Sequence, residues 1–467
     1  MTDLQQAPPA LIHNRINRFL ATPVYIAAVS LLTVLSNLFG LELPAYTIFC
    51  AITVYVCLFG QDLLPLMPLM VCCYLAPSVG NNPGHREDTL FSVAGGGVYI
   101  LCLAGVIVIS LLYRVIRDRK QFLTRKYVLL PGIFALCGSY LLSGIGSEAY
   151  PGSLPRNLLF AFLQCVSVAV PYLLFCGGIN WQKVRKDYFA WIGFATGCIL
   201  LLELTGIYLT RNVVVDGIIV RKAIFTGWGM HNNIGGMLAF SIPFAFYLAT
   251  KYRKGWLGTV VGSAFLLGAI ATCSRSSILC GSLGFFFCVL LMLYYARNRR
   301  HNAIALVTIV GVLIFSIVLF HRPLLRLFSG ILGMGTDPSS RDTIYLEGLK
   351  LFAKAPIFGN SFFSPGYQPW DWSTVEGFSS FFPPRWHNTV IQLLASCGAV
   401  GLLCYGLHRA QTIKLFLSSY CKEKSFIACF LLVFILTNLF DCHFYNLGPT
   451  LFYSMALAFA ESCPHKK

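Results

Sequence analysis

Residues 381–394 read Phe-Phe-Pro-Pro-Arg-Trp-His-Asn-Thr-Val-Ile-Gln-Leu-Leu, and they join the longest polar segment of the chain to an apolar helix. The polar segment runs from His321 to Trp386. A loop of about 65 residues is uncommon in a compact protein unless it is functional or disordered. Its aromatic content argues against disorder, which requires low hydrophobicity. We therefore predict a large folded loop at 321–386 that covers a site, and a membrane helix that begins at His387.

The composition is that of an integral membrane protein. Of 467 residues, 57% are hydrophobic and 11% are charged, whereas roughly 25% are charged in an average soluble domain. Apolar runs long enough to cross ~30 Å of hydrocarbon recur along the whole chain. Fourteen candidates fall at about 22–41, 44–60, 62–78, 90–113, 127–146, 157–179, 188–209, 233–250, 257–273, 276–296, 303–320, 387–407, 426–441 and 447–461. The predicted fold is all-α, a polytopic transmembrane bundle of 12–14 spans in which residues 1–467 form one domain and the large loop carries short helices.

Two parts of this assignment have alternatives. Only Gln61-Asp62 separates the runs 44–60 and 62–78, so this pair either crosses the membrane twice or forms a re-entrant hairpin. Near the start, Arg15 and Arg18 precede an apolar run, as they do in a signal peptide. The run from Ala21 to Leu41 is long enough to span, so we interpret it as the first transmembrane helix.

The distribution of basic residues predicts the orientation. The net charge is +17, and 23 of the 35 Lys and Arg fall on one side if the N-terminus is cytoplasmic, as the positive-inside rule requires. The charge therefore reflects membrane topology, and nucleic acid is not an expected partner. Several unusual polar residues then lie at or near the outer face: His231, Arg275, Arg341, Arg385, His387 and Asp441.

Common cofactor and metal motifs are absent from the sequence. The eighteen cysteines lie mainly within apolar runs, without CxxC or Cys/His metal spacing, which indicates small apolar packing residues. The chain has no P-loop, Rossmann glycine pattern, HExxH or GxSxG. We therefore predict no cofactor and no metal.

Arg275 lies between the runs 257–273 and 276–296, with almost no connection between them. A tight turn must join these helices, and it places the arginine at the membrane boundary. An ionisable residue at this depth indicates a functional site by default. The alternative is that the side chain extends to lipid phosphate.

Arg341 follows Asp337 and Ser339, either of which can cap a helix whose first turn contains the arginine. The apolar face of this surface helix is predicted to consist of Tyr345, Leu346, Leu349 and Phe352. The alternative is a solvated arginine in a loop.

His387 begins a span directly after Pro383-Pro384-Arg385-Trp386. The positive end of the helix dipole favours a neutral imidazole, which is the form that a general base requires. Asn388 and Gln392 lie one helical turn apart and share a polar edge. The alternative for His387-Asn388 is a helix cap.

A second helix start lies at 227–236, where Asn232 or Asn233 can cap the span and its free N–H groups would favour an anion. Arg275, Arg341, this helix start and His387 are all expected on one face. Together they suit a diphosphate leaving group beside an activated hydroxyl.

The order of these motifs resembles the bacterial O-antigen ligase and O-antigen polymerase superfamily over about residues 225–407. The motifs are Asn232-Asn233, Ser274-Arg275-Ser276, Arg341 followed by Lys354-Ala355-Pro356-Ile357-Phe358-Gly359-Asn360, and His387-Asn388 followed by Gly398-Ala399-Val400-Gly401-Leu402. The long loop between Arg341 and His387 is also similar.

The resemblance implies a metal-independent, inverting membrane glycosyltransferase. It would take a glycan from a polyprenyl diphosphate carrier, usually undecaprenyl diphosphate, on the outer side of the bacterial cytoplasmic (inner) membrane. By position, His387 would be the catalytic base, and Arg275 and Arg341 would bind the diphosphate. Asn388, Asn232 and Trp386 complete the predicted substrate-binding residues. From composition alone, we also predict that an aromatic run stacks on sugar rings: Trp370, Trp372, Phe378, Phe381, Phe382 and Trp386.

The acceptor remains open among a growing glycan, a lipid A core and a protein, and His387-Asn388 slightly favours ligase-type chemistry. A rival class is a transporter or flippase of lipid-linked glycans, which predicts charges near the midpoints of several spans. Glu203 is the clearest such charge. A channel or scaffold would leave His387 and both arginines without a joint role. We therefore expect glycosyl transfer.

Overall fold

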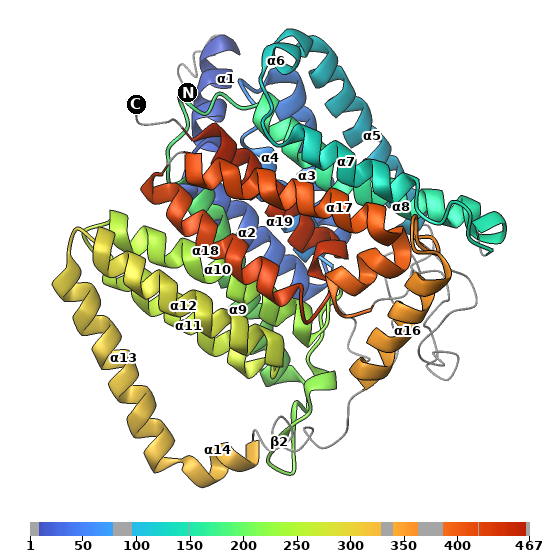
Figure 1. Ribbon diagram of the computed structural model, residues 1–467. Helices are drawn as coiled ribbons and strands as arrows, with labels where there is room; N and C mark the ends of the chain where they lie inside the picture. Colours follow the sequence, from blue (N-terminus) through green and yellow to red (C-terminus); the bar gives the residue numbers. More distant parts are fainter. Residues whose placement is uncertain are drawn as a thin grey trace.

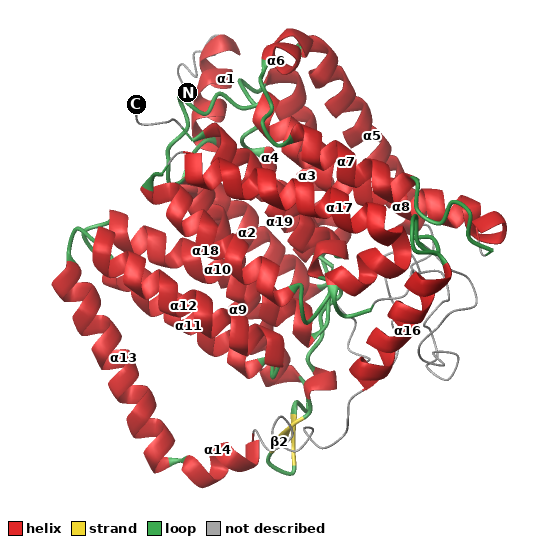
Figure 2. Cartoon of the chain, in the orientation of Figure 1, coloured by secondary structure: helices red, strands yellow, loops and turns green. Residues whose placement is uncertain are grey.

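The computed structural model describes residues 9–77, 96–148, 150–327, 340–362, 386–418 and 420–463. In these ranges the chain is a bundle of helices with one small hairpin, β1 (Val214–Val215) and β2 (Ile218–Ile219) (Figure 2). Eight of the described helices are long and apolar enough to cross a membrane, and a bent pair, α1 (Pro9–Leu20) and α2 (Pro23–Phe39), makes a possible ninth. The predicted all-α polytopic bundle is confirmed.

Each of the fourteen predicted apolar runs contains a helix, but the helices differ in length (Figure 1). The long candidates are α3 (Glu42–Phe59), α5 (Gly96–Arg117), α8 (Tyr150–Gly177), α9 (Tyr188–Thr210), α10 (His231–Lys251), α12 (Arg275–Tyr295), α13 (Arg299–Leu319) and α17 (Thr389–Ser418). Shorter helices are α4 (Leu66–Leu75), α6 (Arg119–Thr124), α7 (Leu130–Leu141), α11 (Trp256–Ala271), α18 (Lys422–Thr437) and α19 (Leu447–Ser462). With ten residues, α4 extends only about 15 Å, so this helix cannot cross the bilayer by itself.

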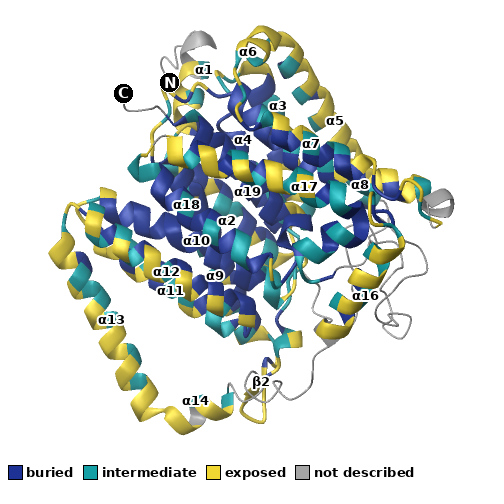
Figure 3. Cartoon of the chain, in the orientation of Figure 1, coloured by how far each residue is buried: buried dark blue, intermediate teal, exposed yellow. Residues whose placement is uncertain are grey.

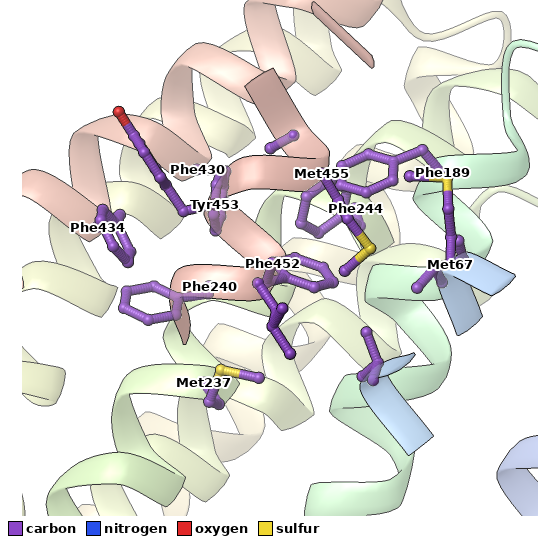
Figure 4. Packing of buried hydrophobic residues seen from close by; sticks show 14 of the residues in the cluster. Met67, Phe189, Met237, Phe240, Phe244, Phe430, Phe434, Phe452, Tyr453 and Met455 are labelled. Atoms are coloured by element: carbon purple, nitrogen blue, oxygen red, sulfur yellow. The ribbon is translucent and has the colours of Figure 1, made fainter. Parts of the chain in front are cut away.

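Helix α10 is the centre of the bundle, with 94% of its hydrophobic window buried, and Figure 3 shows it in the colour of buried residues among the other helices. Its aromatic residues pack against α18 and α19. The Phe240 and Phe430 rings lie 5.8 Å apart edge to face, and the Phe244 and Phe452 rings 5.4 Å apart (Figure 4). A helix that is apolar all round suits such a buried position.

Helix α17 is broken at Gly398, whose φ of 65° and ψ of −159° are not helical. The segment 355–362 packs into the break. The backbone N–H groups of Ala399 and Val400 donate to the carbonyls of Pro356 (2.8 Å) and Ile357 (3.2 Å). In return, the N–H of Asn360 donates to the Ala395 carbonyl at 2.9 Å. The groups released by the break are thus satisfied by another segment, as a bilayer requires.

Two glycines allow this close approach. Gly359 also has a positive φ, 71°, and a Cβ there would collide with the Ser396 carbonyl. A Cβ at Gly398 would lie 2.6 Å from the Gly359 nitrogen. The motif 354–360 and the glycine motif of α17, which the sequence marked separately, therefore form one interlocked structure.

Charged groups lie inside the bundle at several positions, and Glu203 and the guanidinium of Arg409 are two of them. Glu203 of α9 accepts hydrogen bonds from the Asn37 amide and from Nε1 of Trp228 at 3.1 Å. The count of basic residues on the cytoplasmic side assigned Arg409 to the connector that follows the predicted run 387–407, but Arg409 lies within α17. Its Nη1 donates to the Tyr453 hydroxyl at 2.8 Å, and its guanidinium lies 4.5 Å from the Tyr405 ring centre. Its assignment to a connector was wrong, because α17 continues nine residues beyond it.

Candidate active site

The start of α17 is bound to the connector between α18 and α19, residues 438–446. Oδ1 of Asn388 accepts from the N–H groups of Val390 (2.8 Å) and Ile391 (3.2 Å), so the helix is capped by Asn388. Its Nδ2 donates to the Leu439 carbonyl at 2.9 Å, and the Thr389 N–H donates to the Asn438 carbonyl at 2.8 Å. The alternative prediction, that Asn388 caps the helix, thus agrees with its observed contacts.

The connector places a carboxylate beside His387. Oδ1 of Asn438 accepts from the Thr389 hydroxyl (2.9 Å) and the Phe444 N–H (2.7 Å), which fixes the connector on α17. Asp441 then lies with Oδ1 3.3 Å from Nδ1 of His387. The side chains are 36% exposed for His387 and 12% for Asp441, so the imidazole faces outward while the carboxylate supports it from inside.

This pair has a definite electrostatic arrangement. Burial raises the pKa of Asp441. The hydrogen bond with His387 and the nearby His443 lower this pKa by more than burial raises it, so the net pKa lies well below its usual range. Asp441 is therefore ionised at neutral pH and favours a proton on Nδ1 of His387. In that tautomer Nε2 has the free lone pair, which is the arrangement of a general base.

His387 has an uncommon backbone conformation, with a φ of 50°. A positive φ is rare outside glycine, although histidine adopts it more readily than most residues. The Tyr345 hydroxyl donates to the His387 carbonyl at 3.2 Å, and the next residue, Asn388, donates through Nδ2 to the Leu439 carbonyl. Contacts on both sides thus keep the imidazole in place.

Helix α16 (Ser340–Lys354) supplies Tyr345 and includes Arg341 in its first turn, as predicted. It packs beside the start of α17 (Figure 1). Arg341 precedes Tyr345 by four residues, which is about one helical turn. The backbone at Arg341 is therefore one turn from the residue that contacts His387. The predicted caps, Asp337 and Ser339, lie outside the described residues.

The predicted apolar face of α16 was partly wrong. Leu346 and Leu349 are 53% and 42% exposed. The packed face contains Ile344, Gly348 and Leu351 together with the predicted Tyr345. This face contacts Trp386 and Ile391 at the start of α17. A Cβ at Gly348 would lie 2.5 Å from Ile391, so this glycine permits the close approach.

Trp386 is only 1% exposed and packs with Ile344 and Ala395. The backbone N–H of Trp386 donates to Oε1 of Gln392 at 3.1 Å. This burial favours a structural role for its ring, and sugar stacking by Trp386 stays a prediction. Arg385 and the other predicted stacking residues, Trp370, Trp372, Phe378, Phe381 and Phe382, lie outside the described residues.

Arg275 is the first residue of α12, and its side chain is exposed. The turn before it spans only Thr272 to Ser274, as the sequence indicated, with Cys273 at a φ of 55°. Ser274 caps α12 by accepting from the Ser277 N–H at 3.5 Å. This tight turn fixes Arg275 at one end of the bundle.

Helix α10 begins at His231, and its cap position is Met230, whose side chain has no oxygen that could accept from the first-turn amides. The prediction that Asn232 or Asn233 caps the helix was therefore wrong, because both lie inside its first turn. An α-helix N-terminus without a side-chain cap retains its attraction for an anion.

Two glycines of α10 show that the helix starts and connectors described above lie close together. A Cβ at Gly235 of α10 would lie 2.5 Å from Oγ1 of Thr272, in the turn that carries Arg275. A Cβ at Gly236 would lie 2.7 Å from the His443 ring. The α10 start, the α11–α12 turn, the connector with Asp441 and the α17 start thus meet at one end of the bundle.

Asp441 and His443 were missed as site residues. Asp441 was predicted only as one of the polar residues near the outer face, and His443 was not predicted at all. His443 is fully buried, its ring meets Phe240 edge to face at 5.6 Å, and burial lowers its pKa. Two ionisable residues in a nine-residue connector between the last spans were the available signal.

Within the part of the chain that the structure describes, no group of three or more His, Cys, Asp and Glu side chains could hold a metal ion. The chemistry available there consists of the imidazole, its carboxylate, two arginine positions and a helix N-terminus.

The fold and this site define a multi-pass membrane protein with a histidine–carboxylate pair at one end of its bundle. Residues 260–406 match the family described as O-antigen ligase, which confirms the resemblance to the O-antigen ligase and polymerase superfamily. The matched region runs from α11 to α17 and includes Arg275, Arg341 and His387. The match supports a glycosyltransferase of this general type, acting on a lipid-linked glycan and an acceptor. No curated protein matches the chain.

Proposed function

We propose that this protein transfers a glycan from a polyprenyl diphosphate carrier, with undecaprenyl the expected lipid, to an acceptor at the outer face of the bacterial inner membrane. The acceptor is a lipid A core, a growing glycan or a protein. The observation that carries the proposal is the contact between Nδ1 of His387 and Oδ1 of Asp441, 3.3 Å apart at the start of α17.

His387 acts as the base in the proposed reaction. Its Nε2 takes the proton from the acceptor hydroxyl as the oxygen attacks the anomeric carbon. Asp441 holds Nδ1–H and stabilises the imidazolium that forms. The bond from the anomeric carbon to the diphosphate oxygen breaks, and attack from the opposite face inverts the configuration.

The leaving group needs positive charge to stabilise it. Arg275, beside the α10 start, and Arg341, one turn from Tyr345, are assigned to the diphosphate because guanidinium groups bind phosphate oxygens in pairs. Asn232, in the first turn of α10, lies at a helix end that favours anions. Cations and a helix dipole can supply this neutralisation without a metal ion.

A direct assay tests the proposal. The purified protein is incubated with a polyprenyl-diphosphate oligosaccharide in the presence of a chelator, and the lipid-linked and released glycans are analysed by gel and mass spectrometry. A ladder from the donor alone identifies a polymerase. Turnover only with added lipid A core or protein identifies a ligase-type transferase. No turnover with any of these acceptors contradicts the proposal.

Transport of lipid-linked glycans is the second candidate, and Arg409 favours it. A buried cation inside a membrane helix is typical of a substrate pathway. Its aromatic and hydroxyl contacts also suit a structural role. Reconstituted liposomes distinguish the two, because a flippase moves the donor across the bilayer unchanged, whereas a transferase consumes it.

A further inference from the structure

Helices α18 and α19 form an antiparallel pair, and a cysteine lies at the end of each helix that is remote from the 438–446 connector. Cys421 is the N-cap residue of α18, and Cys463 is the C-cap residue of α19. Both helices have sixteen residues, so the two caps lie at the same end of the pair. We call Cys421 and Cys463 the cap cysteines. They lie opposite the connector that carries Asp441, so they belong to no part of the candidate active site.

The packing of α18 on α19 brings the cap cysteines together. The Phe430 and Phe452 rings meet edge to face at 5.5 Å (Figure 4). One turn closer to the α18 start, Phe426 lines a small hollow together with Phe459 of α19. The same antiparallel register continues to the helix ends, where the side chains of the two cap cysteines form a hydrogen bond.

The two thiols have different environments, which favour negative charge on one sulfur. The hydrogen bond with Cys463 lowers the pKa of Cys421 to about 7, against the opposing effect of burial. The same hydrogen bond and burial raise the pKa of Cys463, on which the charges of Glu423 and Lys424 act in opposite directions. Cys421 also lies at the N-terminus of α18, where the helix dipole favours an anion. At neutral pH, Cys421 is therefore largely a reactive thiolate while Cys463 keeps its proton.

Exposure and compartment also suit a reactive pair. Cys421 is partly exposed, whereas Cys463 is only 8% exposed. The charge pattern predicts that this end of the bundle faces the cytoplasm, where thiols are kept reduced and disulfides are usually transient and catalytic or redox-sensing. An accessible thiolate beside a second thiol that can react with it is the usual arrangement of a redox sensor.

We propose that Cys421 and Cys463 are a redox modification site, which a hydroperoxide converts into a disulfide. The Cys421 thiolate attacks the terminal peroxide oxygen, the O–O bond breaks, and the leaving oxygen takes a proton from water. The Cys463 sulfur then displaces the oxygen of the resulting sulfenic acid, so that an S–S bond forms and water leaves with the Cys463 proton. Both sulfurs are oxidised and the peroxide is reduced. The proposal does not depend on the proposed transferase activity.

The disulfide would join two helix ends that are attached to different neighbours. At the α18 start, Nζ of Lys422 donates to the Thr250 carbonyl of α10 at 3.3 Å. At the α19 end, Glu461 accepts from the Tyr172 hydroxyl of α8 at 2.7 Å. The bond also constrains the unfolded chain, because it closes a loop that contains both helices. The oxidised protein should therefore have a Tm about 5 °C higher than the reduced protein.

The test uses the purified full-length protein in detergent, reduced and then freed of reductant. Hydrogen peroxide is added at pH 7, the remaining thiols are blocked with N-ethylmaleimide, and peptides are analysed by mass spectrometry. A disulfide between Cys421 and Cys463 should form, and added reductant should reverse both the disulfide and the rise in Tm. Absence of this disulfide after peroxide treatment would overturn the proposal.

A matched control pair lies within the bundle. The side chains of Cys288 in α12 and Cys429 in α18 also form a hydrogen bond, but they are only 0% and 7% exposed and neither lies at a helix N-terminus. This pair should stay reduced under the same treatment. Equal oxidation of the two pairs would overturn a specific modification site.

Serine variants separate the roles of the two sulfurs. In Cys463→Ser, peroxide should leave Cys421 as a sulfenic acid that dimedone labels, and the rise in Tm should be lost. In Cys421→Ser, Cys463 should remain a thiol over the same time. Dimedone labelling of Cys463 in that variant, as fast as labelling of Cys421 in Cys463→Ser, would contradict the proposed reaction.

Discussion

At the residue scale, the site depends on how one imidazole is oriented. Nδ1 of His387 meets Asp441, the Tyr345 hydroxyl binds the His387 carbonyl, and Asn388 caps the following helix. Arg275 and Arg341 are placed by the start of α12 and the first turn of α16. Arg275 therefore has a support separate from that of the imidazole, whereas Arg341 shares α16 with Tyr345, so conservative substitutions of the arginines are needed to separate their contributions to activity.

Replacing Asp441 by Asn should lower kcat about 100-fold or more, because the amide no longer fixes the reactive tautomer of His387. The donor KM should change little, since Asp441 is buried behind the imidazole. Steady-state kinetics with a fixed acceptor measure both constants. An Asp441→Asn enzyme with wild-type kcat would show that the carboxylate has no part in the reaction.

Acid should remove a stabilising contribution of the same carboxyl group. Its pKa is lower in the folded protein than its unfolded value near 3.9. The contribution is therefore complete above about pH 4 and declines as the pH falls toward the folded pKa. The Tm difference between wild type and Asp441→Asn should thus be larger at pH 6 than at pH 3. A difference independent of pH would contradict this linkage.

Arg275→Lys and Arg341→Lys should each weaken donor use, because lysine keeps the charge but loses the planar pair of N–H donors. The expected effect is a rise of about tenfold in donor KM or an equal fall in kcat/KM. Lys222→Arg exchanges the same two residue types in the opposite direction, in the segment that follows the hairpin. This control variant should have wild-type donor kinetics. Unchanged donor kinetics in both lysine variants would exclude the arginines from diphosphate binding.

At the element scale, α17 is a broken helix whose break is filled by the 355–362 segment. Gly398→Ala should destabilise the protein by about 1–3 kcal/mol from its positive φ alone, and more from the clash with Gly359. Gly406→Ala, in the same helix but with open space around it, should be neutral or slightly stabilising. Thermal unfolding in detergent compares the two, and equal Tm values would contradict the interlocked arrangement.

Sequence patterns located the helices and several site positions because hydropathy and local spacing are local properties. Arg275 in a tight turn and Arg341 in a first helical turn follow from such spacing. The contact of His387 with Asp441 does not, since these residues are 54 positions apart and meet through the docking of the 438–446 connector on the start of α17. The break at Gly398 was equally hidden, because a glycine in an apolar run fits both a continuous and a broken helix.

At the scale of the whole molecule, the candidate membrane spans differ widely in burial, since α10 is almost completely buried and α13 is almost completely exposed. The α10 start contacts both the turn that carries Arg275 and His443 of the Asp441 connector. By contrast, α13 is almost uncovered. The proposed reactive end assembled around α10 and the lipid-facing flank of α13 together suit an enzyme that handles membrane-embedded substrates.

The most direct measurement compares wild type and His387→Ala in the metal-free transfer assay with a polyprenyl-diphosphate oligosaccharide and the acceptor that supports turnover. Protein level and membrane insertion should be similar in both, because the imidazole is 36% exposed and contributes little packing, while loss of its contact with Asp441 should lower the Tm only slightly. Glycan transfer should be detected for the wild type and abolished for the variant. Transfer by His387→Ala at the wild-type rate would contradict the assignment of this histidine as the catalytic base.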